Sequence, residues 1–309
     1  MPAVVAAQRA AAALALLASP AALAHGRLTT SSGDRIADAV VLALIAAAAI
    51  LHAIGTRRLA RRTSDPRPVH GAAAFYGGLA LLALALFGPL DAWAERSFTL
   101  HMIQHELLML AVAPLLVTGR PLAHWTWALP VAARRRIRAF QRAWRGPGVW
   151  QALTSLTGAC ALQSLALWAW HLPAWFRAAL EHPGLHVLQH ATFLAAALCF
   201  WWSVLRPGPA RRRAPASIAS LFVTTLTTGA LGALLTFAGT PWYAEPGVVP
   251  LFGLTPLEDQ ELGGLLMWIP GGTVYMVIAL VLGLRALRAG PTAPPALPAG
   301  GPRPAGARP

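Results

Sequence analysis

Histidine pairs with one spacing occur twice in the chain. His101 and His105 flank Met-Ile-Gln, and His186 and His190 flank Val-Leu-Gln, so both stretches read H-x-x-Q-H. Residues four apart lie on one face of a helix, so each pair can direct two imidazoles at one ion, as the paired histidines of zinc-binding helices do. Neutral imidazole suits copper, zinc and iron. The two pairs therefore predict a metal or haem site, with a histidine hydrogen-bond network as the alternative.

A fifth histidine, His171, stands in Trp-His-Leu-Pro at the end of the apolar run between the two pairs. If consecutive apolar runs cross a membrane in alternating directions, both pairs begin their helices at the outer surface and His171 ends its helix there. Polar groups within a span are costly and usually face the bundle interior. The five imidazoles are therefore expected at one depth, and the predicted metal ligands are His101, His105, His171, His186 and His190.

Other polar and sulfur-containing side chains lie near the outer ends of the same runs. Amide side chains could orient the imidazoles, outer carboxylates could hold a histidine tautomer or bind the ion, and thioethers such as that of Met102 would favour Cu(I). Glu106 cannot share the helix face of its neighbour His105, so it could pair with another helix. The accessory residues predicted on these grounds are Asp91, Gln104, Glu106, Gln189, Asp259 and Met267. The remaining histidines His52, His70 and His124 are expected at the opposite interface, without partners.

The elements that position these residues are membrane spans. The 309 residues are 56% hydrophobic and only 12% charged, too few polar residues to cover a soluble core of this size. Apolar runs of about twenty residues recur along the chain, which is the length that crosses a bilayer as a helix. We therefore predict an all-α integral membrane protein with seven spans, near Ile36–Gly55, Gly71–Leu90, Leu100–Thr118, Val149–His171, Leu185–Leu205, Ser217–Phe237 and Gln260–Leu284.

The basic residues predict the orientation of the bundle. All of them are arginine, and most lie in the loops after the first, third and fifth predicted spans and after the last. Arginine-rich loops stay in the cytoplasm, so the N-terminus is expected outside, the C-terminus inside, and the histidines toward the periplasm or cell exterior. The net charge of +14 would suggest nucleic acid in a soluble protein, but no basic patch is interleaved with exposed aromatics. Nucleic acid is excluded as a partner, and the partner surface expected is the lipid of the cell (inner) membrane.

The two ends of the chain differ from the bundle. Arg9 precedes a short apolar stretch that ends in Ala22-Leu23-Ala24, which predicts a signal peptide over residues 1–24. Cleavage would leave His25 as the first residue, whose amino group and ring could together chelate copper. Residues 25–289 would form the seven-helix domain, and the Pro/Ala/Gly-rich residues 290–309 a disordered cytoplasmic tail.

The motifs resemble the CtaG family of multi-spanning cytochrome c oxidase assembly factors. The resemblance is carried by HMIQHELLMLAVAPLLVTGRPL (His101–Leu122), WHLPAWFRAALEHPGLHVLQHATFLAAALCFWW (Trp170–Trp202) and PLEDQELGGLLMWIPGGTVYM (Pro256–Met276). It implies maturation of a haem–copper oxidase, with oxidase subunits as partners and copper as the metal supplied or held. It also carries the family's five histidines onto those named above, and its recurrent outer acids onto Asp91 and Asp259.

Three functions remain open at this point. The first is a non-enzymatic assembly factor that binds copper at the outer histidines and delivers or holds it for the oxidase. The second is a membrane haem or metal redox enzyme that uses the same histidines. The third is a copper permease, since Gly263-Gly264 and Pro270-Gly271-Gly272 could break or kink the last span, as transporters do at substrate sites. The sequence leaves the oligomeric state open.

Overall fold

The computed structural model describes residues 32–62, 67–143, 148–206, 210–243 and 253–289. The predicted signal peptide, His25 and the C-terminal tail lie outside these residues. Helices make up the regular structure of the described chain, as predicted. They are α3 (Ser32–Ala60), α4 (Arg67–Phe87), α5 (Pro89–Ala94), α6 (Phe98–Glu106), the π-helix η1 (Leu107–Val112), α7 (Ala113–Thr118), α8 (Pro121–Ala128), α9 (Val131–Ala143), α10 (Val149–Leu153), α11 (Leu156–Trp170), α12 (Pro173–Glu181), α13 (Pro183–Leu205), α14 (Ala210–Thr236) and α15 (Pro256–Arg288).

Several of these helices are long and apolar enough to cross a bilayer. Five meet both conditions within the described residues: Ile36–Ala60, Phe98–Thr118, Pro183–Leu205, Arg211–Thr236 and Pro256–Arg288. The apolar part of α4, Gly71–Phe87, is shorter, and α11 has only 15 residues. Large apolar side chains such as Leu44, Phe222 and Leu280 are exposed, which suits helices that face lipid. A multi-pass membrane protein is therefore supported, while the count of seven spans and their orientation stay predictions.

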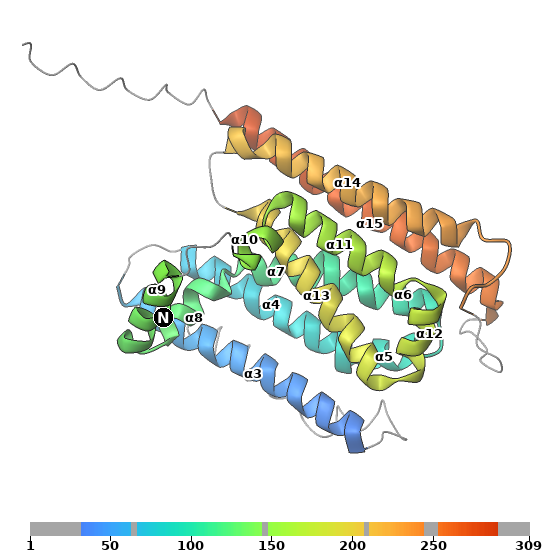
Figure 1. The fold of residues 1–309 in the computed structure, drawn as a ribbon, viewed down its shortest axis with the longest axis horizontal. Coiled ribbons are helices and arrows are strands. Elements are labelled where there is room, and N and C mark those ends of the chain that lie inside the picture. The colour runs from blue at the N-terminus through green and yellow to red at the C-terminus, as the bar shows by residue number, and fades with distance from the viewer. Residues whose placement is uncertain (1–31, 63–66, 144–147, 207–209, 244–252, 290–309) are drawn as a thin grey trace, which may run out of the picture.

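The long helices run roughly alongside one another (Figure 1). The α14–α15 hairpin forms one edge and α3 the opposite edge, with α4, α6, α11 and α13 between them. The short helices α5 and α12 gather beside α6 at one end of the bundle, while α8, α9 and α10 lie at the other end. The H-x-x-Q-H motifs lie on α6 and α13, so the predicted site is at the α5–α12 end.

Two predicted spans are interrupted, and both interruptions have local causes. The second span ends at Phe87, and α5 restarts at Pro89 after the extended Gly88, because proline is well tolerated in the first turn of a helix. The fourth span is divided into α10 and α11, since the Ser155 side chain accepts a hydrogen bond from the backbone of Gly158 and starts a new helix. The last span, in contrast, is one unbroken helix across Pro270.

Proline also fixes where the site helices begin and end. Leu172 and His182 are extended, and each precedes a proline that opens the next helix, as expected because the residue before proline avoids the helical conformation. These two breaks leave His171 at the end of α11 and start α13 just before His186. A third proline, Pro114, cannot donate to the preceding turn, and the wider π-helical turns of η1 lie directly before it. That irregular segment follows His105 within one turn.

The α14–α15 pair depends on glycines at the helix contact. A Cβ added to Gly264 would lie 2.7 Å from the carbonyl oxygen of Gly232, which is too close for either backbone to accommodate. Gly264→Ala is therefore expected to destabilise the detergent-solubilised chain by about 1–3 kcal/mol, measured as a lower midpoint of thermal unfolding. In Gly77→Ala the added Cβ meets nothing within 4 Å, so this helical control should be neutral or stabilising. Equal midpoints for the two variants would contradict the packing.

Candidate metal centre

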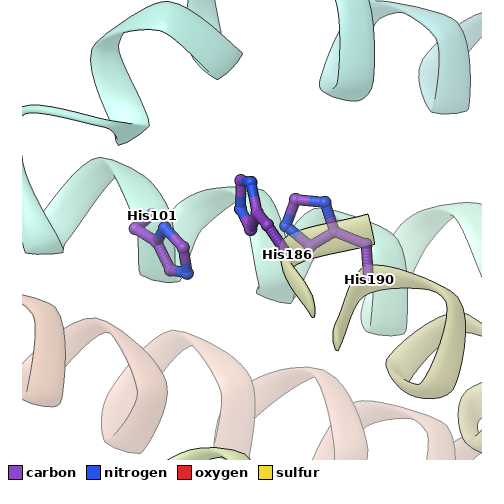
Figure 2. Close-up of side chains that lie close together, drawn as sticks. All are labelled: His101, His186 and His190. Carbon is purple, nitrogen blue, oxygen red and sulfur yellow. The ribbon is translucent and has the colours of Figure 1, made fainter. Parts of the chain in front are cut away.

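Three of the predicted ligands converge most closely. His101 from α6 and His186 and His190 from α13 each offer one ring nitrogen, and these nitrogens lie within 4.8 Å of one another. Figure 2 shows the three rings gathered between the two helices. Three imidazoles around one ion with metal–nitrogen bonds of about 2.0 Å stand about 3.5 Å apart. Closure of the rings by about 1 Å would therefore place them on a common metal ion.

The other two predicted ligands adjoin this group. The ring centroid of His105 is 4.3 Å from that of His101 and 5.2 Å from that of His190. The ring centroid of His171 is 6.3 Å from that of His105. The structure thus brings all five predicted histidines into one neighbourhood. Whether all five are ligands stays a prediction, since three form the closest group.

The cluster is deeply buried, and one of its rings, that of His105, has no hydrogen-bond partner within the described residues. His101, His105 and His171 are at most 3% exposed. Within the described chain, both ring nitrogens of His105 are buried and form no hydrogen bond, while the Gln189 amide and the Ala94 carbonyl lie near His101 without well-aligned bonds. Buried polar atoms without partners cost free energy. A metal ion that accepts the one lone pair of each neutral ring would remove part of that cost.

Asp91 and Gln104, two of the predicted accessory residues, are joined by a hydrogen bond. The Gln104 side-chain nitrogen donates to a carboxylate oxygen of Asp91 over 2.9 Å and to the carbonyl of Ala85 over 2.7 Å. These bonds tie α6 to α4 and α5. Asp91 therefore lies buried on the short helix α5, where it accepts a hydrogen bond from an amide. Gln104 fixes the helix that carries His101 and His105.

Asp259 holds the start of α6. Its carboxylate accepts hydrogen bonds from the Ser97 hydroxyl at 2.8 Å and from the backbone nitrogens of Phe98 and Thr99 at 2.6 and 3.1 Å. The Thr99 hydroxyl also donates to the Asp259 carbonyl over 2.8 Å. A carboxylate at a helix N-terminus satisfies donors that have no partner within the helix. Asp259 therefore positions the first histidine helix from α15.

The remaining accessory residues occupy different surroundings. Gln189 is fully buried beside His101. Met267 is buried in the same hydrophobic cluster as Met102. Glu106 points toward α15, where a Cβ on Gly271 would meet its carboxylate at 2.8 Å. The carboxylate of Glu106 thus lies against a helix other than its own.

Aromatic side chains cover the cluster, and the sequence reasoning missed them. Phe176 of α12 contacts His101, with ring centroids 5.2 Å apart, and also packs on Tyr243 at 4.2 Å. Phe98 stacks on Tyr243 at 4.9 Å. The Tyr243 hydroxyl donates to the carbonyl of His171 over 2.6 Å, and burial raises the pKa of Tyr243, so the phenol remains a donor. This cover shields the histidines from water.

A second histidine contact corrects one prediction. His52 is fully buried and His124 is 3% exposed, with their ring centroids 4.3 Å apart. The Thr56 hydroxyl lies 3.3 and 3.1 Å from their Nδ1 atoms, and His52 Nε2 lies 3.2 Å from the Gly119 carbonyl. These two histidines therefore have partners and join α3 to α8. The expectation that they stand alone at an interface is wrong.

Comparison with known proteins gives the family of the chain. Residues 50–289 match the family described as cytochrome c oxidase caa3 assembly factor (Caa3_CtaG), so the chain belongs to that family. The uncharacterized protein Mb0105 of Mycobacterium bovis and the uncharacterized protein MT0111 of Mycobacterium tuberculosis are each 26% identical over 256 residues. The match covers 77% of this chain but only 38% of each relative's length. No solved structure matches the chain.

Proposed function

We propose that this chain is a copper-handling assembly factor for a haem–copper cytochrome c oxidase, and not an enzyme. It binds copper at the histidines of α6 and α13, which face the periplasm or cell exterior, and holds or delivers the ion for an oxidase subunit that docks there. The observation that carries the proposal is the buried group of His101, His186 and His190, found in a chain that belongs to an assembly-factor family.

Two further features support copper handling at this position. The ligands are imidazoles with thioethers nearby, which is a donor set that suits copper in either oxidation state. The cluster lies near the end of the bundle that carries the short helices α5 and α12. The aromatic side chains of Phe98, Phe176 and Tyr243 cover it. Movement of that cover would expose the histidines to a docked partner. The arginine distribution supports placement of this end outside the cytoplasm.

The alternative functions have less support. The centroids of neighbouring imidazole rings in the cluster are 4.3 to 6.3 Å apart. Binding of a haem between two of these histidines would require the rings to separate. The permease alternative depended on a broken final span, and α15 is continuous. A Soret band that survives purification would favour the haem protein, while copper uptake into sealed vesicles would favour the permease.

The proposal predicts a loss of oxidase maturation when the cluster is damaged. In cells carrying His105→Ala, terminal oxidase activity is expected to fall to the level of a strain that lacks the chain, because a buried imidazole of the cluster is gone. Immunoblotting of membranes should show that the variant still inserts. His182→Ala is the matched control, since His182 lies at the same end of the bundle but is exposed. Normal oxidase activity in the His105→Ala strain would refute the proposed role of the cluster.

A further inference from the structure

One methionine and two histidines lie side by side next to the three-histidine group. We propose that Met102, His105 and His171 form a second metal position, which contains a thioether and is selective for Cu(I). The inference rests on the proposed function, because it divides the predicted five-histidine site into two adjoining positions with different chemistry. The group of His101, His186 and His190 offers nitrogen alone, whereas this second position adds sulfur.

The orientation of His171 provides the first evidence. Its Nδ1 lies 2.7 Å from the carbonyl oxygen of Leu167. Since a carbonyl can only accept, Nδ1 carries the hydrogen, and Nε2 of the neutral ring carries the lone pair. That Nε2 lies 3.4 Å from the sulfur of Met102, an atom that also offers only lone pairs. Two lone pairs face each other in a buried site, and a cation between them would turn this repulsion into attraction.

The distance between these two atoms suits a bridging ion. With metal–nitrogen and metal–sulfur bonds of about 2.0 and 2.3 Å, a separation of 3.4 Å subtends about 105° at the metal. This angle is close to the tetrahedral value. The two atoms therefore already stand at a separation that lets both bind one ion. Met102 and His171 are also fully or almost fully buried, so water does not compete for the position.

His105 supplies the third ligand. It follows Met102 by three residues on α6 and so lies on the same helix face. Its ring centroid is 6.3 Å from that of His171, and both of its ring nitrogens are buried without a hydrogen bond in the described chain. One soft thioether with two imidazoles is a set that favours Cu(I) over harder divalent ions.

The two positions share a border at His105. The His105 ring is 4.3 Å from that of His101 and 5.2 Å from that of His190, measured between centroids. A ring that touches both groups can exchange an ion between them by replacing one ligand at a time. Copper could thus move between a nitrogen-only position and a sulfur-containing position without leaving the buried pocket.

X-ray absorption on the full-length, detergent-purified chain tests this inference. With one equivalent of Cu(I) under reducing conditions, the spectrum is expected to contain a sulfur neighbour. Met102→Leu, which conserves volume and so should fold, is expected to lose that sulfur signal and at least tenfold in Cu(I) affinity, measured by competition with a chromophoric chelator. Its Zn(II) affinity should be unchanged. Met109→Leu, which alters a buried methionine of the same cluster whose sulfur lies 3.9 Å from the Gln163 side-chain nitrogen, should retain the sulfur signal.

The outcomes separate this inference from the proposed function. A chain that binds Cu(I) through nitrogen alone, or a Met102→Leu variant that keeps the sulfur signal, overturns the second position and leaves copper binding intact. A chain that binds no copper overturns both. His186→Ala removes a ligand of the nitrogen-only position, so it should keep the Cu(I)–sulfur signal. Loss of that signal in His186→Ala would show a single shared site and overturn the division into two.

Discussion

Replacement of His186 by alanine is expected to lower the Zn(II) affinity of the purified chain more than about 100-fold, because changes to residues that only hydrogen-bond a metal ligand already cost 10- to 100-fold. His186 contributes one of the three nitrogens that lie within 4.8 Å of one another. Only two imidazoles of that group would remain for the ion. Zinc is the probe because it has no redox chemistry and accepts imidazole readily. Titration against a chromophoric zinc chelator measures the change.

The control for this experiment is His182→Ala. His182 is the residue directly before α13 and is exposed, with its Nδ1 3.1 Å from the Ala178 carbonyl. Zn(II) affinity in this variant should equal that of the unaltered chain. Equal affinities in His186→Ala and the unaltered chain would show that His186 is no ligand. The buried imidazoles would then have to be explained as a structural cluster.

The convergence of the histidines could be predicted because it depends on depth and helix face. Spacing of four residues fixes the face, and alternating spans fix the depth, so His101 and His186 could be placed at one level from the sequence. The lateral packing of the helices could not be predicted in this way. Which histidines approach most closely depends on how α6 and α13 rotate against each other, and no period in the sequence encodes that rotation. The close group of three is therefore a finding of the structure.

The same limit explains the residues whose partners were not foreseen. Asp91 and Asp259 were predicted near the ion because carboxylates at the outer ends of spans can bind metals. In the structure Asp91 accepts from Gln104, and Asp259 accepts from the first turn of α6. Donors at a helix N-terminus are always present, but the sequence does not show which acid on another helix reaches them. Ser97 and Asp259 stand 162 positions apart in the chain, which places this contact beyond any local pattern.

The span boundaries show how far apolar runs predict the fold. The runs located the long helices correctly, because the bilayer fixes their length. Two internal breaks were missed although their signals stand in the sequence, at Pro89 and at Ser155. The contact between His52 and His124 was also missed, and the sequence indicates it only through Gly55. A Cβ added to this glycine would collide with the His124 backbone. A glycine indicates a close approach, but not its partner.

Asp259→Ala is expected to combine lower stability with weaker metal binding. The change removes a buried carboxylate that accepts from Ser97, Phe98 and Thr99, and hydrogen bonds to a charged group contribute about 1.5–3 kcal/mol each. With allowance for non-additivity, a loss of about 3 kcal/mol would lower the thermal midpoint by roughly 6–12 °C. Since α6 carries His101 and His105, Zn(II) affinity should also fall about 10- to 100-fold.

Glu258, the acidic residue directly before Asp259, provides the control for this prediction. Glu258 is exposed, and its carboxylate accepts from the backbone and hydroxyl of Thr255 at the start of its own helix. Glu258→Ala should therefore lower the thermal midpoint much less than Asp259→Ala does, since only a capping contact at the surface is lost, and should leave Zn(II) affinity unchanged. If the two variants lost the same stability and affinity, the carboxylate of Asp259 would act only on α15. If Asp259→Ala lowered affinity without lowering stability, Asp259 would be a ligand of the ion rather than the residue that positions the histidine helix.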